Sequence, residues 1–166
     1  MHRGETEAAT ARADEAGIAL REARLALEPF AALAASGPLH DAEKEYAEAR
    51  LTAAFVRGTA LPSAAALEVE PSAWLKGLAE AASELRRHLL DRLRAGDLTR
   101  GEELLDVMDD VYSLLITVDY PDAVTAGLRR TTDALRAVLE RTRGDLTTTL
   151  LQRRLQDAIE GGLTGE

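Results

Sequence analysis

At 166 residues the chain is long enough to form one domain with its own hydrophobic core. It contains no cysteine, which excludes disulfides, iron–sulfur clusters and thiolate zinc sites. The formal net charge of −9 argues against non-specific DNA binding. No uncharged run approaches the roughly 20 apolar residues of a membrane span, and no signal peptide opens the sequence, so we expect a cytoplasmic protein.

The composition favours an all-α fold, because alanine, leucine, glutamate and arginine dominate and β-branched and aromatic residues are scarce. We expect a bundle of five or six helices in one domain over residues 1–166. The first helix is predicted at about 5–27, with a weak point at Gly17. After "SGPLH", a second helix is predicted at about 41–57, closed by Gly58.

The second half of the chain continues the helical pattern. The segment "TALPSAAALEVEP" is predicted to be a connector with one short turn of helix, and Pro71 suits the first turn of a long helix over 71–95. Thr99 and Glu102 fit a capping box that opens a helix over 99–118. Pro121 then breaks the pattern. A final helix is predicted over 128–160, with an interruption at Gly144 and a frayed end.

The positive charge is concentrated near the C-terminus. Residues 127–156 have a net charge of +4, which leaves −13 for the remainder. Such a segment can form a local anion-binding face, or it can be a solvated helix whose arginines make i,i+4 ion pairs. The few aromatic residues are expected in the core rather than on a surface that stacks with bases; they are Phe30, Phe55, Trp74 and Tyr112.

Two pairs of carboxylates are candidates for a metal site. Glu45 lies at the edge of the apolar face of the 41–57 helix and Glu48 lies near it, whereas Glu43, Arg50 and Arg57 fall on another side. A second set occupies one face of the 71–95 helix, opposite its leucine stripe: Glu80, Glu84 and His88.

Two helices that each supply two carboxylates can hold a hard cation such as Mg²⁺ or Mn²⁺. The same spacings are common on solvated helix faces, so spacing alone leaves the site open. Glu84 paired with Arg87 or His88 is the simpler interpretation of the second set.

Four segments, in order along the chain, resemble the translin/Trax family, and its archaeal Trax-like members in particular. They are "EYAEA" (45–49), "WLKGLAEAASELRR" (74–87), "RAGDLTRGEELLDVMDDVY" (94–112) and "DYPDAVTAGLRRTTDALRAVLERTRGDLT" (119–147). The resemblance implies an all-α subunit of a closed homo-oligomer that binds single-stranded RNA or DNA. It also implies the Mg²⁺- or Mn²⁺-dependent endoribonuclease activity of Trax-type subunits.

The resemblance assigns roles residue by residue. The family's E-Y-V-E-A motif corresponds to Glu45–Ala49 and makes Glu45 and Glu48 catalytic metal ligands. Its G-L-A-D-x-x-G-E-L motif corresponds to Gly77–Leu85, which adds Glu80 at the position of an aspartate and Glu84 at that of a glutamate. Glu80 is longer by a methylene, and Ser83, in place of a glycine, is expected to crowd the same region. Arginines expected to bind the nucleic-acid backbone are Arg86, Arg87, Arg92, Arg129 and Arg130.

The sequence starts where relatives have already completed a long first helix, so either the start is truncated or this member dispenses with that helix. Three functions stay open: a metal-dependent endoribonuclease, a translin-like RNA or single-stranded-DNA-binding protein without catalysis, and a helical assembly protein with no nucleic-acid role. The last predicts a 127–156 helix with many ion pairs.

Overall fold

The computed structural model describes residues 3–35 and 37–163, with side chains from 7 to 161. In this part of the chain, five long and three single-turn helices follow one another and no strand occurs, which confirms the predicted all-α fold. The long helices are α1 (Arg3–Leu27), α3 (Pro38–Arg57), α5 (Pro71–Arg94), α6 (Leu98–Leu115) and α8 (Leu128–Leu163). The short ones are α2 (Ala31–Ala34), α4 (Ala64–Leu67) and α7 (Asp122–Thr125). Across the described ranges, no helix combines the length and apolarity that crossing a bilayer requires.

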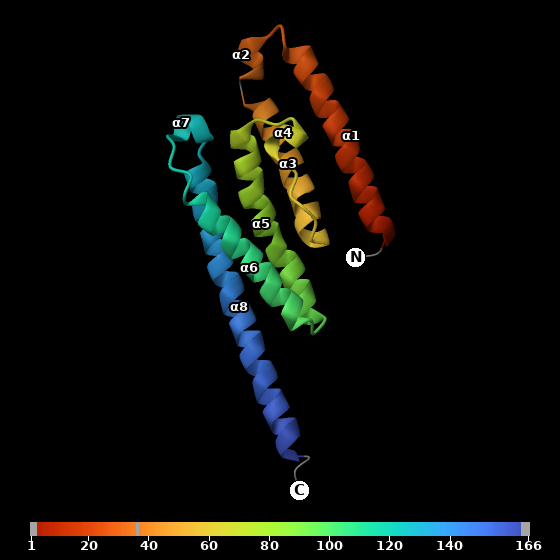
Figure 1. The fold of residues 1–166 in the computed structure, drawn as a ribbon, viewed down its shortest axis with the longest axis vertical. Helices are drawn as coiled ribbons and strands as arrows, with labels where there is room; N and C mark the ends of the chain where they lie inside the picture. The colour runs from red at the N-terminus through yellow and green to blue at the C-terminus, as the bar shows by residue number, and fades with distance from the viewer. Residues whose placement is uncertain (1–2, 36, 164–166) are drawn as a thin grey trace.

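Helix α5 is the centre of the bundle. It packs against α3 on one side and against α6 and α8 on the other, and α1 packs on the outer side of α3 (Figure 1). The predicted leucine stripe of α5 is buried: Leu85 and Leu89 share a core cluster with Met108 of α6 and Leu139 of α8. The opposite face of α5, with small residues, is therefore left to meet α3.

Two predicted helix ends were wrong and have simple causes. Helix α3 begins at Pro38 rather than at residue 41, because proline is well suited to the first turn. Helix α6 is capped by Asp97, whose Oδ1 accepts a 3.1 Å hydrogen bond from the backbone N–H of Arg100, so Thr99 lies inside the helix and does not cap it. The predicted interruption at Gly144 is also wrong, since α8 passes through it unbroken.

Glu43 is buried, contrary to its predicted place on a charged face. Arg24 of α1 donates two hydrogen bonds to Glu43 Oε1, at 2.9 and 2.7 Å, and the backbone N–H of Glu70 donates to Oε2 at 2.9 Å. One carboxylate thereby joins α1, α3 and the residue that precedes α5, which fixes how these three helices sit together.

Three of the four aromatic side chains expected in the core pack against it: Phe55, Trp74 and Tyr112. The indole N–H of Trp74 also donates to the Pro62 carbonyl at 2.9 Å. Phe30 is 59% exposed, so its predicted core position was wrong. It lies between α1 and the single turn α2, where the described part of the chain provides no core to cover it.

The C-terminal part of α8 projects beyond the other helices (Figure 1). Its residues from 151 to 161 are all exposed. Three large apolar side chains recur on this part at intervals of four residues and are each more than half exposed: Leu151, Leu155 and Ile159. In the part of the chain that the structure describes, the bundle leaves this face uncovered.

Candidate functional site

A glycine brings the two carboxylate-bearing helices together. A Cβ atom added at Gly77 of α5 would lie 2.9 Å from the Lys44 carbonyl oxygen and 3.0 Å from the Glu48 backbone nitrogen of α3. Real Cβ atoms do not come this close to backbone atoms, so only glycine permits this approach. The backbone of α5 therefore lies directly against the turn of α3 that carries Glu45 and Glu48.

Three of the four predicted site carboxylates meet at this crossing. Glu45, Glu48 and Glu80 each offer an oxygen, and the three oxygens lie within 4.8 Å of one another. The side chain of Glu45 is largely exposed, whereas those of Glu48 and Glu80 are partly buried. We call this set the carboxylate cluster. Three oxygens so close together have the spacing and chemistry to coordinate a hard divalent cation.

Lys44 lies within the carboxylate cluster and was not predicted to belong to the site. Its Nζ atom is 2.9 Å from Glu45 Oε1 and 2.8 Å from Glu80 Oε2. Burial works against the charged ammonium, but the hydrogen bonds to Glu80 and Glu45 outweigh it and raise the pKa of Lys44 above its usual value. The ammonium therefore stays charged and offsets part of the negative charge.

Glu48 carries the most perturbed carboxyl group of the cluster. Burial, followed by the negative charges of Glu80 and Glu45, raises the pKa of Glu48 to about 7, while Lys44 acts in the opposite direction. Close to neutral pH, this carboxyl is thus divided between its protonated and ionised forms. A divalent cation would favour the ionised form.

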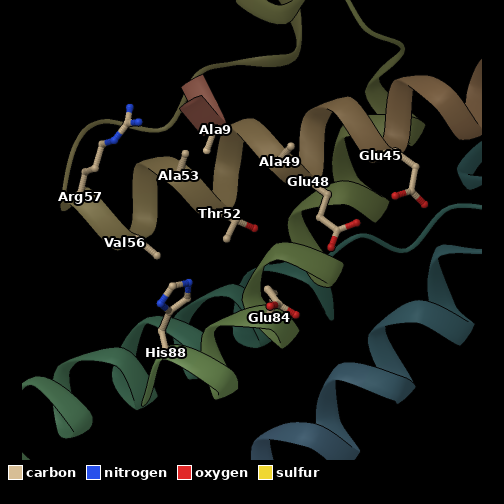
Figure 2. Close-up of a pocket in the computed structure, with 10 residues that line it drawn as sticks. All are labelled: Ala9, Glu45, Glu48, Ala49, Thr52, Ala53, Val56, Arg57, Glu84 and His88. Atoms are coloured by element: carbon tan, nitrogen blue, oxygen red, sulfur yellow. The ribbon is translucent and has the colours of Figure 1, made fainter. Parts of the chain in front are cut away.

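Glu84 lies outside the carboxylate cluster, one turn further along α5. Its Oε1 is 3.9 Å from Arg87 Nη1, the surface pair that was the simpler interpretation of the spacing. It also lines a cavity of about 340 Å³ between α3 and α5, together with Glu45, Glu48, Thr52 and His88 (Figure 2). Glu84 is therefore next to the cluster but contributes no oxygen to it.

The cavity continues from the carboxylate cluster along the C-terminal half of α3. Its other walls are largely apolar, and its polar lining includes the ring of His88 (Figure 2). Burial lowers the pKa of His88, although Glu84 and Asp91 act in the opposite direction. Thr52 Oγ1 is buried and has no hydrogen-bond partner among the residues that the structure describes.

Ser83 does not crowd the carboxylate cluster, contrary to expectation. Its hydroxyl donates to the Ala79 carbonyl at 2.9 Å, and its side chain lines a surface depression beside Val138 of α8. The hydroxyl of the serine in place of the family's glycine thus bonds within α5, and Ser83 does not line the cavity at the carboxylate cluster.

The predicted RNA-binding arginines have different surroundings. Arg86 is engaged within the chain, donating to Thr142 Oγ1 at 3.1 Å and to Asp145 Oδ2 at 2.7 Å, and so ties α5 to α8. Arg87 pairs with Glu84. The other three are exposed: Arg92 near the end of α5, and Arg129 and Arg130 in the first turn of α8.

The arginines of the positive segment 127–156 fall into two groups. Arg143 pairs with Glu140 and Asp109, and Arg153 pairs with Asp157. Within the described ranges, no ion pair is formed by the other five, which are Arg129, Arg130, Arg136, Arg141 and Arg154. Asp145 of the same segment also pairs with Arg86, so four ion pairs involve this segment among the described residues.

Comparisons with known proteins give relatives but no family model that matches. An uncharacterized protein of Methanocaldococcus jannaschii is 30% identical over 125 residues, which are 75% of this chain and 56% of that protein. The chain therefore spans only about 56% of the length of this curated relative. The crystal structure of AfC3PO matches with a TM-score of 0.75 and 31% identity, over 90% of this chain and 78% of that one. The structure of AfC3PO in complex with duplex RNA matches with a TM-score of 0.66 and 27% identity, over 90% and 93%.

Proposed function

The chain belongs to the translin/Trax family and resembles its archaeal C3PO members, and from this premise we propose that it binds RNA and cleaves single-stranded RNA with the help of Mg²⁺ or Mn²⁺. The observation that carries the proposal is the convergence of Glu45, Glu48 and Glu80 from two helices to within 4.8 Å. Carboxylates on an ordinary solvated helix face would not require a glycine that lets a second acidic helix approach so closely.

Support for RNA as the ligand comes from two directions. AfC3PO, similar over 90% of this chain, has been solved in complex with duplex RNA. In this chain, five arginines on α8 that form no ion pair with a described residue offer positive charge to a phosphate backbone, although the total charge is negative. Single-stranded RNA is the substrate we propose for cleavage, with single-stranded DNA as a further ligand.

The proposed chemistry is hydrolysis of a phosphodiester bond. Glu45, Glu48 and Glu80 would hold the cation, and Glu84 borders the same cavity. When bound, the cation would neutralise phosphate charge and lower the pKa of a water molecule. Without it the carboxylates would repel the phosphate, so their own part is to position the cation at the opening of the cavity.

A second function is favoured by a specific observation. Glu80, the longer residue at the family's aspartate position, is paired with Lys44, and Glu84 lies outside the carboxylate cluster. An RNA-binding protein that has lost cleavage would have such a site. The two functions differ only in metal-dependent turnover.

The proposal is tested by cleavage of an end-labelled single-stranded RNA with Mn²⁺, with Mg²⁺ and with EDTA. We expect metal-dependent products from the wild type and none from Glu45→Gln/Glu48→Gln. The control Glu22→Gln/Glu28→Gln changes two exposed carboxylates of the α1 region by the same charge and should cleave normally. RNA binding without cleavage by the wild type would identify the second function. A duplex RNA probe in parallel shows which form is preferred.

We also propose that the chain forms a homo-oligomer through the projecting part of α8. Leu151, Leu155 and Ile159 form one apolar stripe that is exposed in the described part of the chain and that a second copy can cover.

A further inference from the structure

The carboxylate cluster already contains a cation, the ammonium group of Lys44. It bridges Glu45 of α3 and Glu80 of α5 at 2.9 and 2.8 Å, and its side chain is only 15% exposed. A lysine ammonium and a small divalent cation are both compact positive charges that bind carboxylate oxygens. The two would therefore compete for the same oxygens.

A permanent structural ion pair in this protein is built differently. The Arg24–Glu43 pair has two hydrogen bonds from a planar guanidinium, a third from the Glu70 backbone, and a carboxylate that is 3% exposed. Lys44 holds its partners through one atom on a flexible stem, and one partner, Glu45, is 68% exposed. The Lys44 ion pairs are thus the kind that a stronger cation can displace.

The backbone of Lys44 is held in place by the helix crossing, whereas its ammonium lies at the end of a flexible side chain. The close approach of Gly77 fixes the Lys44 carbonyl at the α3–α5 crossing. The four-carbon side chain can change rotamer without disturbing this crossing. Departure of the ammonium therefore does not require the helices to separate.

We propose that Lys44 is a built-in competitor of the divalent cation, occupying the carboxylate cluster in the cation-free protein and leaving it when the cation binds. This inference rests on the proposed metal-dependent function of the same carboxylates. Competition by Lys44 would lower the affinity of the protein for the cation. In the cation-free protein, the ammonium would reduce the repulsion among the three carboxylates. The cation would bind only where the free concentration of Mg²⁺ or Mn²⁺ is high enough to displace the lysine.

The chain contains only two lysines, which allows a direct test on the wild-type protein. Lys76 lies on α5, one turn before Glu80, and makes no ion pair with any residue in the described part. Acetylation of the two lysines is followed by mass spectrometry during a Mn²⁺ titration. We expect Lys44 to react slowly in EDTA and several-fold faster at saturating Mn²⁺, and Lys76 to react at an unchanged rate.

The second measurement is calorimetry of Mn²⁺ binding to the wild type, Lys44→Met and Lys76→Met. Removing an ammonium that bridges two carboxylates should tighten Mn²⁺ binding about tenfold, whereas the matched loss of charge at Lys76 should have little effect. The labelling experiment needs no variant, so it stays decisive even where Lys44→Met folds poorly.

The possible results separate this inference from the proposed function. If wild-type Mn²⁺ binding requires Glu45 and Glu48, but Lys44 labelling is unaffected by Mn²⁺ and Lys44→Met binds no tighter, the competitor role is overturned and the metal site stands. If neither the wild type nor Lys44→Met binds Mn²⁺, the metal site itself is refuted, and the inference with it. If Lys44→Met binds Mn²⁺ and the wild type does not, the competition is confirmed, and the result counts against metal-dependent activity of the wild type.

Discussion

Gly77 lies against the backbone of Lys44 so closely that a single added carbon would come within 2.9 Å of the Lys44 carbonyl oxygen. The neighbours it would meet next, Ala47 Cβ and Glu48 N, are both at 3.0 Å. Two of these three atoms belong to the backbone and cannot move aside as a flexible side chain can. The distance between α3 and α5, and with it the carboxylate cluster, depends on the absence of a side chain at this position.

Gly77→Ala should therefore destabilise the protein and weaken cation binding together. Overpacking of this kind costs about 1–3 kcal/mol in the free energy of unfolding, measured by urea denaturation, and Mn²⁺ affinity measured by calorimetry should fall. Gly144→Ala in α8 is the control, because its added Cβ would meet nothing within 4 Å. That substitution should stabilise the helix by up to about 1 kcal/mol. Equal effects of the two substitutions would contradict the role given to Gly77.

Arg24→Met should be among the most destabilising substitutions of a charged residue. It leaves the buried Glu43 carboxylate with only the Glu70 N–H as a donor, a loss of about 3 kcal/mol in the free energy of unfolding. Arg50→Met removes the exposed pair with Asp14 and should cost less than about 1 kcal/mol. Thermal or urea unfolding of both variants tests the difference, and a similar small cost for each would show that Glu43 is not held as described.

Glu48→Gln should change stability in a pH-dependent way. The pKa of Glu48 is raised from 4.5 to about 7, because burial and the charges of Glu80 and Glu45 disfavour ionisation. A carboxyl with a raised folded-state pKa contributes no penalty below its unfolded pKa, and its ionisation destabilises the fold as pH rises toward the folded value. In EDTA, Glu48→Gln should thus melt about 2–3 °C above the wild type at pH 8 and close to it at pH 5.

The matched control for this pH experiment is Glu28→Gln, an exposed residue that follows α1. Its melting temperature should differ from the wild type by a similar small amount at both pH values. A constant difference between Glu48→Gln and the wild type at both pH values would mean that Glu48 ionises normally.

Arg129→Gln/Arg130→Gln should weaken RNA binding and make it less sensitive to salt. For a single strand, each phosphate that is no longer neutralised by the protein reduces the slope of log affinity against log salt by about 0.7. Arg143→Gln/Arg153→Gln removes the same charge from residues already engaged in ion pairs and should have a smaller effect. Fluorescence anisotropy at several salt concentrations measures both slopes. Identical slopes in the two variants would place the RNA elsewhere.

Leu155→Glu/Ile159→Glu should reduce the size of the oligomer, since it puts charge into the stripe proposed to pack against a second copy. Leu25→Glu, a similarly exposed leucine on α1, should leave the size unchanged. Light scattering coupled to size-exclusion chromatography reports the mass directly. A wild-type monomer at all concentrations would refute the assembly.

The sequence was sufficient to predict the long helices and to single out three carboxylates that the structure brings together. Composition and periodicity predict α1, α5 and α8 closely, whereas the likeness to the translin/Trax motifs, and not spacing alone, singled out Glu45, Glu48 and Glu80, which lie together. The cap of α6 was predicted at Thr99, whereas Asp97, two residues earlier, accepts the capping hydrogen bond from the Arg100 N–H. Sequence patterns therefore predict a structural feature well when it depends on the residues of a single helix.

The remaining errors concern pairs of helices that are distant in the sequence. A helical wheel assigns Glu43 to a charged face but contains no information that Arg24 of α1 covers that face. For the same reason, a helical wheel of α5 could not show that Arg86 binds Asp145, which is 59 residues away in the sequence. Lys44 offered one weak signal, as one of two lysines in a chain with 18 arginines. The carboxylate cluster holds a compact ammonium group, for which the planar guanidinium of arginine is not an equivalent replacement.

The projecting part of α8 has a consequence for how the chain folds. The exposed segment runs from residue 151 to residue 161, and a helix of this length is only marginally stable in water when nothing packs against it. The segment also presents three large apolar side chains to solvent. Its helicity should therefore depend on packing against another subunit, so that ordering of this segment and association of the chains become one process. Far-ultraviolet ellipticity would then rise with protein concentration, and dilution would unwind the end of α8 before the bundle itself melts.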